Sequence, residues 1–161
     1  MRAHLAYIWY VVRHKWFVFV ECCKLGIPWL GIIHDWSKFR PGELIPYVHY
    51  FYEPNGTLIP RRDETGYYKP SDTGDEAFDW AWLLHQKRNK HHWQWYCLPE
   101  DEGGMKVLPM PDKYRKEMLA DWRGAGHAQG TPNVLAWYQK HKDKMRLHPE
   151  TRRWLEYQLG D

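Results

Sequence analysis

An adjacent histidine and aspartate follow an apolar run in the stretch Gly31-Ile32-Ile33-His34-Asp35-Trp36-Ser37-Lys38-Phe39. Burying either group without a partner costs on the order of several kcal/mol. Farther along the chain lie more side chains that bind divalent cations well, namely His85, His91, His92 and Asp121. A metal ion would explain why one small chain gathers these groups.

Helix start and stop signals predict helices on both sides of this stretch. The first helix is expected over about residues 3–25, where it is apolar on most faces and therefore buried. The second helix opens at Pro28, carries His34-Asp35 and stops near Phe39. Further helices are expected over residues 43–52, 76–89 with a continuation to 96, 111–122 ended by Gly124 and Gly126, 132–145 and 149–159. No strand is expected, so the predicted fold is all-α: a compact single-domain bundle of six or seven helices over residues 1–161.

Composition limits the classes of partner. The chain has 161 residues, enough for one domain with a core, and its eleven Trp predict large aromatic rings in that core. The net charge of +3 suits an anionic small molecule but gives no strong signal for nucleic acid. Cys22, Cys23 and Cys97 are odd in number and form no CxxC, which predicts no disulfide framework and a cytoplasmic location.

The N-terminal apolar segment is too short to span a bilayer. Its run from Leu5 to Val12 is interrupted by Arg13-His14-Lys15, whereas a spanning helix needs about 20 predominantly apolar residues. We therefore expect a buried helix and no membrane partner.

Residues 53–75 are rich in Pro, Gly and charged side chains and show no core-facing pattern. A loop of this length is usually a functional lid or an insertion. Arg61 and Arg62 give it the composition of a phosphate contact, and a solvated insertion is an equally open interpretation.

The histidine spacings constrain which side chains can share a site. On a helix His34 and Asp35 would point about 100° apart, so they bind one ion only at a helix edge, unless Asp35 bridges two ions. His85 and His92 are seven residues apart and would share a helix face. His91 could turn inward only if the helix ends near Lys90.

Two histidines of the first helix compete for a place beside His34. If the first two helices are antiparallel, residues at similar distances from the turn between them lie side by side. His34 is about 9 Å from that turn along its helix, whereas His14 is about 16 Å and His4 about 31 Å from it. This geometry favours His14, although both histidines could serve packing only.

Asp121 lies between residues that look buried, so it needs a cation or strong donors, with an ordinary salt bridge to an arginine as the alternative. Glu117, one turn earlier, could touch a second ion or orient a histidine. Lys38, three residues after Asp35, would place an ammonium group beside the metal, where it suits a phosphate oxygen.

The ordered set resembles the HD-domain superfamily of metal-dependent phosphohydrolases, closest in style to its cyclic-dinucleotide phosphodiesterase branch. The residues that carry this resemblance are His34-Asp35-Trp36-Ser37-Lys38, His85, His91-His92 and Ala120-Asp121. Ser37 stands where that branch has Gly and Trp93 where it has Glu, and its Gly-Tyr-Pro signature is absent. The whole chain also resembles an uncharacterised family of small proteins common in phage and bacterial genomes, with the motif His34-Asp35-Trp36-Ser37-Lys38-Phe39.

The resemblance implies an HD-like fold with one or two divalent ions, chosen from Mn, Mg, Fe, Ni, Co or Zn. It implies a first ion held by His14, His34, Asp35 and Asp121, and a second held by Asp35, His85 and either His91 or His92. Asp35 and Lys38 are the implied catalytic residues. The expected contacts to substrate phosphate come from Lys38, Arg88, Arg61 and Arg62.

The implied function is hydrolysis of a nucleotide or nucleotide-like phosphoester, including a nucleotide signal in the cytoplasm of a bacterial host if a phage encodes the chain. One alternative is a protein that sequesters a nucleotide without cleaving it. Another is a helical structural or interaction protein without metal, and a homo-oligomer stays open in every case.

Overall fold

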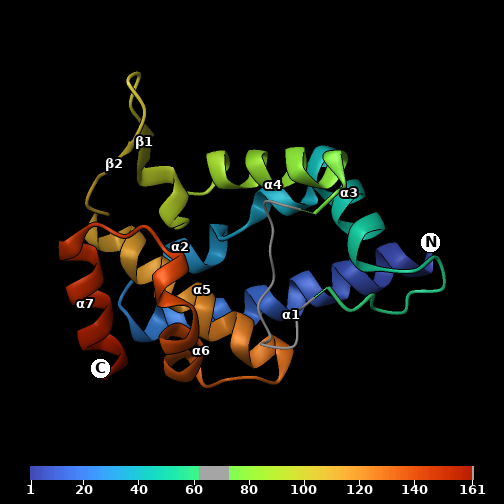
Figure 1. The fold of residues 1–161 in the computed structure, drawn as a ribbon. Helices are drawn as coiled ribbons and strands as arrows, with labels where there is room; N and C mark the ends of the chain where they lie inside the picture. The colour runs from blue at the N-terminus through green and yellow to red at the C-terminus, as the bar shows by residue number, and fades with distance from the viewer. Residues whose placement is uncertain (62–72, 161) are drawn as a thin grey trace. The chain divides into compact units, whose positions relative to one another are not determined.

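The computed structural model describes residues 1–61 and 73–160. These residues are mostly helical, which confirms the predicted class (Figure 1). In chain order the elements are α1 (Arg2–Lys24), α2 (Pro28–Ile33), the 3₁₀-helix η1 (Trp36–Phe39), α3 (Pro41–Phe51), α4 (Glu76–Arg88), η2 (Trp93–Tyr96), β1 (Cys97–Pro99), β2 (Met105–Val107), α5 (Asp112–Gln129), α6 (Val134–His141), η3 (Lys142–Lys144) and α7 (Pro149–Leu159).

The chain divides into two compact units, each made of two separate segments. Unit 1 comprises Met1–Arg13 and Asp35–Arg88, and unit 2 comprises His14–His34 and Asn89–Asp161. One boundary passes through α1 and another falls between the two residues of the His-Asp pair. The single domain expected over residues 1–161 stays a prediction, and each unit is described by itself.

Unit 1 has an aromatic core drawn from α1, α3 and α4. Its buried members are Ala3, Tyr7, Val11, Tyr47, Val48, Tyr50, Phe78 and Ala81. The rings of Tyr50 and Phe78 stack with their centroids 4.1 Å apart. The large rings expected from the composition therefore do build this core.

Unit 2 has its main core around α5, α6 and α7. The buried members are Tyr96, Met110, Met118, Leu119, Tyr138, Met145, Leu147 and Leu155. A smaller cluster of Val18, Cys22 and Ala120 joins α5 to the second half of α1. Here Gly124 permits close packing, because a Cβ added to it would lie 2.7 Å from the backbone nitrogen of Val18.

This packing corrects the predicted end of α5. The helix does not stop at Gly124 or Gly126 but runs to Gln129 and ends at Gly130, whose φ of 74° is left-handed. A glycine inside a helix costs roughly 1 kcal/mol relative to alanine, and close contact with α1 offsets that cost.

The His-Asp pair does not lie on a helix, which corrects the second predicted helix. α2 ends at Ile33, and His34 has an extended ψ of 130°. Asp35 follows with a φ of 54°, the one positive φ of a non-glycine residue in the described part of the chain. Aspartate tolerates this conformation better than most residues, but such backbone is held in place only by its surroundings.

Several other boundaries differ from the expected ones. α4 ends at Arg88, so the His91-His92 pair follows the helix and does not continue it. β1 and β2 form an antiparallel hairpin, so the expectation of no strand is wrong. α6 ends at His141, four residues earlier than expected. Three-residue strands are too short to show the period-two pattern by which strands are recognised.

The sequence led us to expect a buried α1, but one side of this helix is exposed. Leu5, Trp9, Val12 and Trp16 are exposed along it. No helix in the described ranges is both long and apolar enough to cross a bilayer. Of the expected loop at 53–75, residues 62–72 lie outside the described part of the chain.

Candidate metal centre

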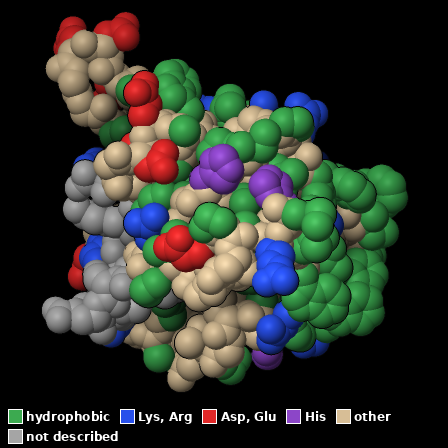
Figure 2. Space-filling view, turned by 90° about the vertical axis from the view of Figure 1, so that its right-hand side faces the viewer, with side chains coloured by type: hydrophobic (Ala, Val, Ile, Leu, Met, Phe, Trp, Pro, Cys, Tyr) green, Lys and Arg blue, Asp and Glu red, His purple; other side chains and the backbone are tan. Residues whose placement is uncertain are grey.

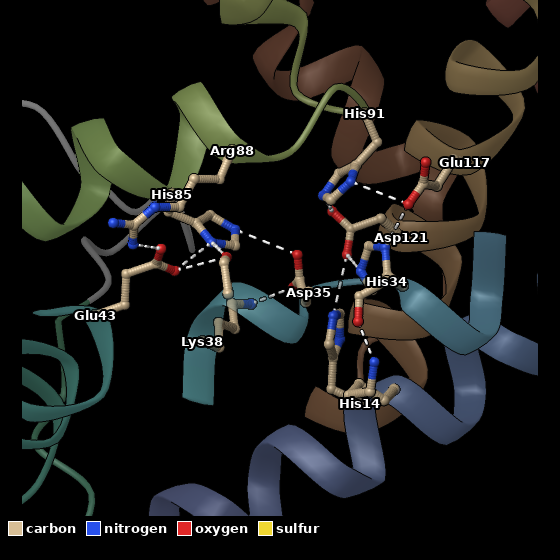
Figure 3. A network of polar contacts seen from close by, with 12 residues as sticks. His14, His34, Asp35, Lys38, Glu43, His85, Arg88, His91, Glu117 and Asp121 are labelled. Carbon is tan, nitrogen blue, oxygen red and sulfur yellow. Dashed lines mark hydrogen bonds and ion pairs between the residues drawn. The ribbon is translucent and has the colours of Figure 1, made fainter. Parts of the chain in front are cut away.

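Five buried or nearly buried side chains, from two helices and from the segments that follow two others, converge in unit 2 (Figure 3). They are His14 on α1, His34 after α2, His91 after α4, and Glu117 and Asp121 on α5. We call this set the unit 2 cluster. Glu117 and Asp121 share a face of α5 because they are four residues apart.

The Asp121 carboxylate meets the Nε2 atoms of three histidines. Its Oδ1 lies 3.2 Å from Nε2 of His14 and 3.3 Å from Nε2 of His34. Its Oδ2 lies 4.0 Å from Nε2 of His91. Three ring nitrogens and a carboxylate therefore gather around one point.

The Glu117 carboxylate lies on the opposite side of two of these rings. Its Oε1 is 3.0 Å from Nδ1 of His34 and 3.2 Å from Nδ1 of His91. A carboxylate only accepts hydrogen bonds, so these contacts assign a hydrogen to each Nδ1. A ring that then gives up its Nε2 proton, as metal binding requires, has its lone pair on the side that faces Asp121.

Both carboxylates are stabilised in their charged form. Burial alone would raise the pKa of Asp121, but hydrogen bonds from His14 and His34 outweigh it and hold that pKa well below its usual range. Burial likewise opposes ionisation of Glu117, whose pKa is lowered by hydrogen bonds from His34 and His91. Two negative charges therefore face three imidazoles in a mostly buried site.

This arrangement could hold a metal ion. Ligand atoms of His14, His34 and Asp121 lie within 4.8 Å of one another, as do those of His34, His91 and Glu117. A donor set of imidazole nitrogens and carboxylate oxygens suits zinc and the divalent transition metals. The contacts favour Asp121 as the ligand and Glu117 as the group that orients two ligands.

In unit 1 the predicted site residues form a different arrangement together with Glu43. We call it the unit 1 network, and its members are Asp35, Lys38, Glu43, His85 and Arg88 (Figure 3). Asp35 Oδ2 lies 2.6 Å from Nζ of Lys38, and Asp35 Oδ1 lies 3.4 Å from Nε2 of His85. On its other side His85 places Nδ1 2.9 Å from Oε2 of Glu43. Glu43 also accepts from Arg88 at 2.5 Å and from the Ser37 hydroxyl at 2.8 Å.

Charges in the unit 1 network are fixed by these contacts. Burial opposes ionisation of Glu43, but hydrogen bonds from His85, Arg88 and Ser37 lower its pKa. Burial lowers the pKa of His85 more than the charges of Asp35 and Glu43 raise it, so the ring favours its neutral form. The network thus places a neutral histidine between the ionised carboxylate of Glu43 and the carboxylate of Asp35, which pairs with Lys38.

The remaining predicted residues are placed as follows. His92 belongs to unit 2, where its ring lies 4.3 Å from that of His91. Because α4 ends at Arg88, it is His91 that lies beside Asp121, so the interpretation that put His85 and His92 on one helix face is wrong. Arg61 donates to the carbonyl of Tyr50, and Arg62 lies outside the described residues.

His14, not His4, is the first-helix residue beside His34, as the antiparallel argument favoured. His4 instead contacts His49 within unit 1, with their rings 6.3 Å apart. The expected joint role of Asp35 with residues of unit 2 stays a prediction.

Glu43 is the residue of the unit 1 network that the sequence reasoning missed. It is completely buried, and a signal for this existed. Glu43, Tyr47 and Tyr50 are spaced by four and three residues, so the acid lies on the same face of α3 as two buried rings. A carboxylate on the apolar face of a helix needs partners.

Comparison with known proteins identifies a family without an activity. No curated protein and no solved structure matches the chain. A family model described as "Family of unknown function (DUF5662)" matches residues 3–161, nearly the whole sequence, and the chain therefore belongs to that family.

Proposed function

We propose that this chain is a metal-dependent phosphohydrolase of the HD type that acts on a nucleotide or nucleotide-like phosphoester. One observation carries the proposal: three histidine Nε2 atoms converge on the carboxylate of Asp121, while Glu117 occupies the Nδ1 side of two of the rings. Such backing of metal-bound histidines by a carboxylate is the usual arrangement in metal sites.

In this proposal His14, His34, His91 and Asp121 hold the ion. A bound divalent ion lowers the pKa of water and polarises phosphoryl oxygens. Glu117 keeps the rings of His34 and His91 in the tautomer that presents Nε2. The burial of the cluster excludes bulk water, which strengthens each of these electrostatic contacts.

Lys38 and Arg88 are our candidates for neutralising phosphate charge. Each is already oriented by a carboxylate, Lys38 by Asp35 and Arg88 by Glu43. A cation held in this way needs little reorganisation when charge develops on a phosphoryl oxygen. The two proposed catalytic residues are Lys38 and Asp35, the latter directly after His34.

Metal analysis together with a hydrolysis assay tests the proposal. The purified protein is loaded with Mn²⁺, Zn²⁺, Co²⁺ or Ni²⁺, its bound metal is quantified, and release of phosphate or nucleoside from a panel of nucleotides is followed. We expect bound metal and turnover of at least one nucleotide in the wild type. Asp121→Asn should lower metal affinity on the order of a thousandfold, because it weakens one ligand of a four-ligand site.

His49→Gln is the matched control, since His49 is exposed on α3 in unit 1 and should leave metal and activity unchanged. A wild-type protein that takes up no metal would contradict the proposal, as would an Asp35→Ala variant of full activity. Nucleotide that binds tightly and is recovered intact would favour the sequestering protein instead.

A further inference from the structure

One side of α1 presents large apolar side chains to solvent. Leu5, Trp9 and Trp16 are 61%, 68% and 62% exposed, and Val12 lies between them and is exposed too. Their spacing of four, three and four residues confines them to an arc of roughly 60° on the helix. We call these four residues the α1 stripe.

The α1 stripe is bordered by cations. Arg2 and Arg13 are exposed and fall beside one edge of the arc. The single acidic residue of α1, Glu21, is buried and pairs with Lys24. The exposed face of the helix is therefore apolar and basic, with no carboxylate on it.

Unit 2 by itself also has exposed apolar side chains. Trp29 and Ile32 of α2 are exposed as well. A Cβ at Gly31 would lie 2.8 Å from Cα of Phe19, so α2 packs closely on the second half of α1 there. Figure 2 shows that hydrophobic side chains are among those exposed at the surface. Patches of this kind mark interaction sites.

The charges and side chains of the α1 stripe favour one class of binding partner over the others. A second copy of the chain would offer the same basic border and, on this face of α1, no acidic side chain to pair with it, which disfavours a symmetric helix pair. A nucleic acid needs a denser row of cations, and Leu5 and Val12 offer no ring on which a base could stack. Tryptophan with bordering arginine is typical of helices that lie in the headgroup region of an anionic bilayer.

We infer that the α1 stripe docks the protein on an anionic lipid surface, with Trp9 and Trp16 at the level of the headgroups. This peripheral contact differs from a membrane span, and it departs from the expectation of no membrane partner. It is independent of the proposed hydrolysis, because no residue of the stripe belongs to the unit 2 cluster or the unit 1 network.

Vesicle flotation tests the inference. The full chain is mixed with vesicles of phosphatidylcholine and phosphatidylglycerol, and separately with phosphatidylcholine alone. We expect flotation with the anionic vesicles only, weakening as salt is added. Trp9→Ser with Trp16→Ser should weaken binding about tenfold or more, since two large apolar groups leave the bilayer. Reversing Arg2 and Arg13 to Glu should have a similar effect.

Trp80→Ser is the matched control, because Trp80 is 59% exposed but lies on α4, away from the stripe. It should float like the wild type, and circular dichroism verifies that each variant keeps its helices. Equal flotation of the double tryptophan variant would overturn the inference. A wild-type dimer in sedimentation that the double variant abolishes, without flotation, would assign the stripe to a second copy.

Discussion

The unit 1 network and the unit 2 cluster use the same residue types but balance charge differently. In unit 1 the carboxylates of Asp35 and Glu43 pair with the permanent cations of Lys38 and Arg88. In the unit 2 cluster, within the described ranges, the side chains paired with the carboxylates of Glu117 and Asp121 are histidines. A histidine neutralises a carboxylate only by binding a proton, whereas lysine and arginine are charged across the physiological range.

This difference separates two roles for buried charge. The unit 1 network carries its own cations, so it is complete as a structural element and can orient Lys38 and Arg88. The unit 2 cluster pairs two ionised carboxylates with histidines, which are not permanent cations, so a divalent cation would complete it. We therefore expect changes in unit 1 to act mainly on folding stability, and changes in unit 2 to act mainly on metal affinity.

Glu43→Ala should produce the largest loss of stability, about 3–5 kcal/mol in the free energy of unfolding, because it leaves Arg88 and His85 without their buried partner. Urea denaturation measures this loss. Glu76→Ala is the control, since Glu76 is an exposed acid of α4 and should change stability by less than about 0.5 kcal/mol.

The same Glu43→Ala protein should bind metal as tightly as the wild type at a temperature where it is folded. Metal affinity that falls together with stability would break the distinction between the two regions.

Glu117→Ala should have a smaller effect, and that effect should fall on metal affinity and not on folding stability. We expect metal affinity to fall by about 10–100-fold, the usual cost of removing a carboxylate that orients ligand histidines. Glu117→Gln should recover part of the affinity, since its amide oxygen can still accept from Nδ1 of His34 and His91. If Glu117 were itself a ligand, Gln would bind metal no better than Ala. Competitive titration with a chromogenic chelator measures all three affinities.

Helix positions were largely predictable, because caps and apolar periodicity are local signals. α7 was placed correctly to the residue, and α1 and α3 to within two residues. The left-handed backbone conformation of Asp35 was not predictable, since no local sequence signal shows that this one residue departs from helical dihedral angles. The two glycines inside α5 misled the prediction for a related reason: only contact with α1 makes Gly124 favourable there.

Within the candidate site, residue types were easier to predict than partners. His14, His34, His91 and Asp121 were proposed from their chemistry, and the geometry of antiparallel helices favoured His14 over His4. The choice between His91 and His92 depended on where α4 ends, a boundary that sequence fixes only to within a few residues. Glu43 was not predicted because it lies in the first turn of α3, where acidic residues are common and need no binding role.

The smallest predicted effect concerns pH and isolates one histidine of the unit 1 network. The pKa of His85 is lowered by burial, so the folded protein binds a proton there less readily than the unfolded chain. Stability from this residue is therefore complete above the ordinary histidine pKa of about 6.5 and declines as pH falls below it, by at most about 1.4 kcal/mol for each pH unit. His85→Gln, which binds no proton, should show a flatter dependence of unfolding free energy on pH between about 6.5 and 5. The lowered pKa of Glu43 adds its own loss only below about 4.5, outside that interval. Parallel curves for the two proteins would mean that burial does not hold His85 neutral in the unit 1 network.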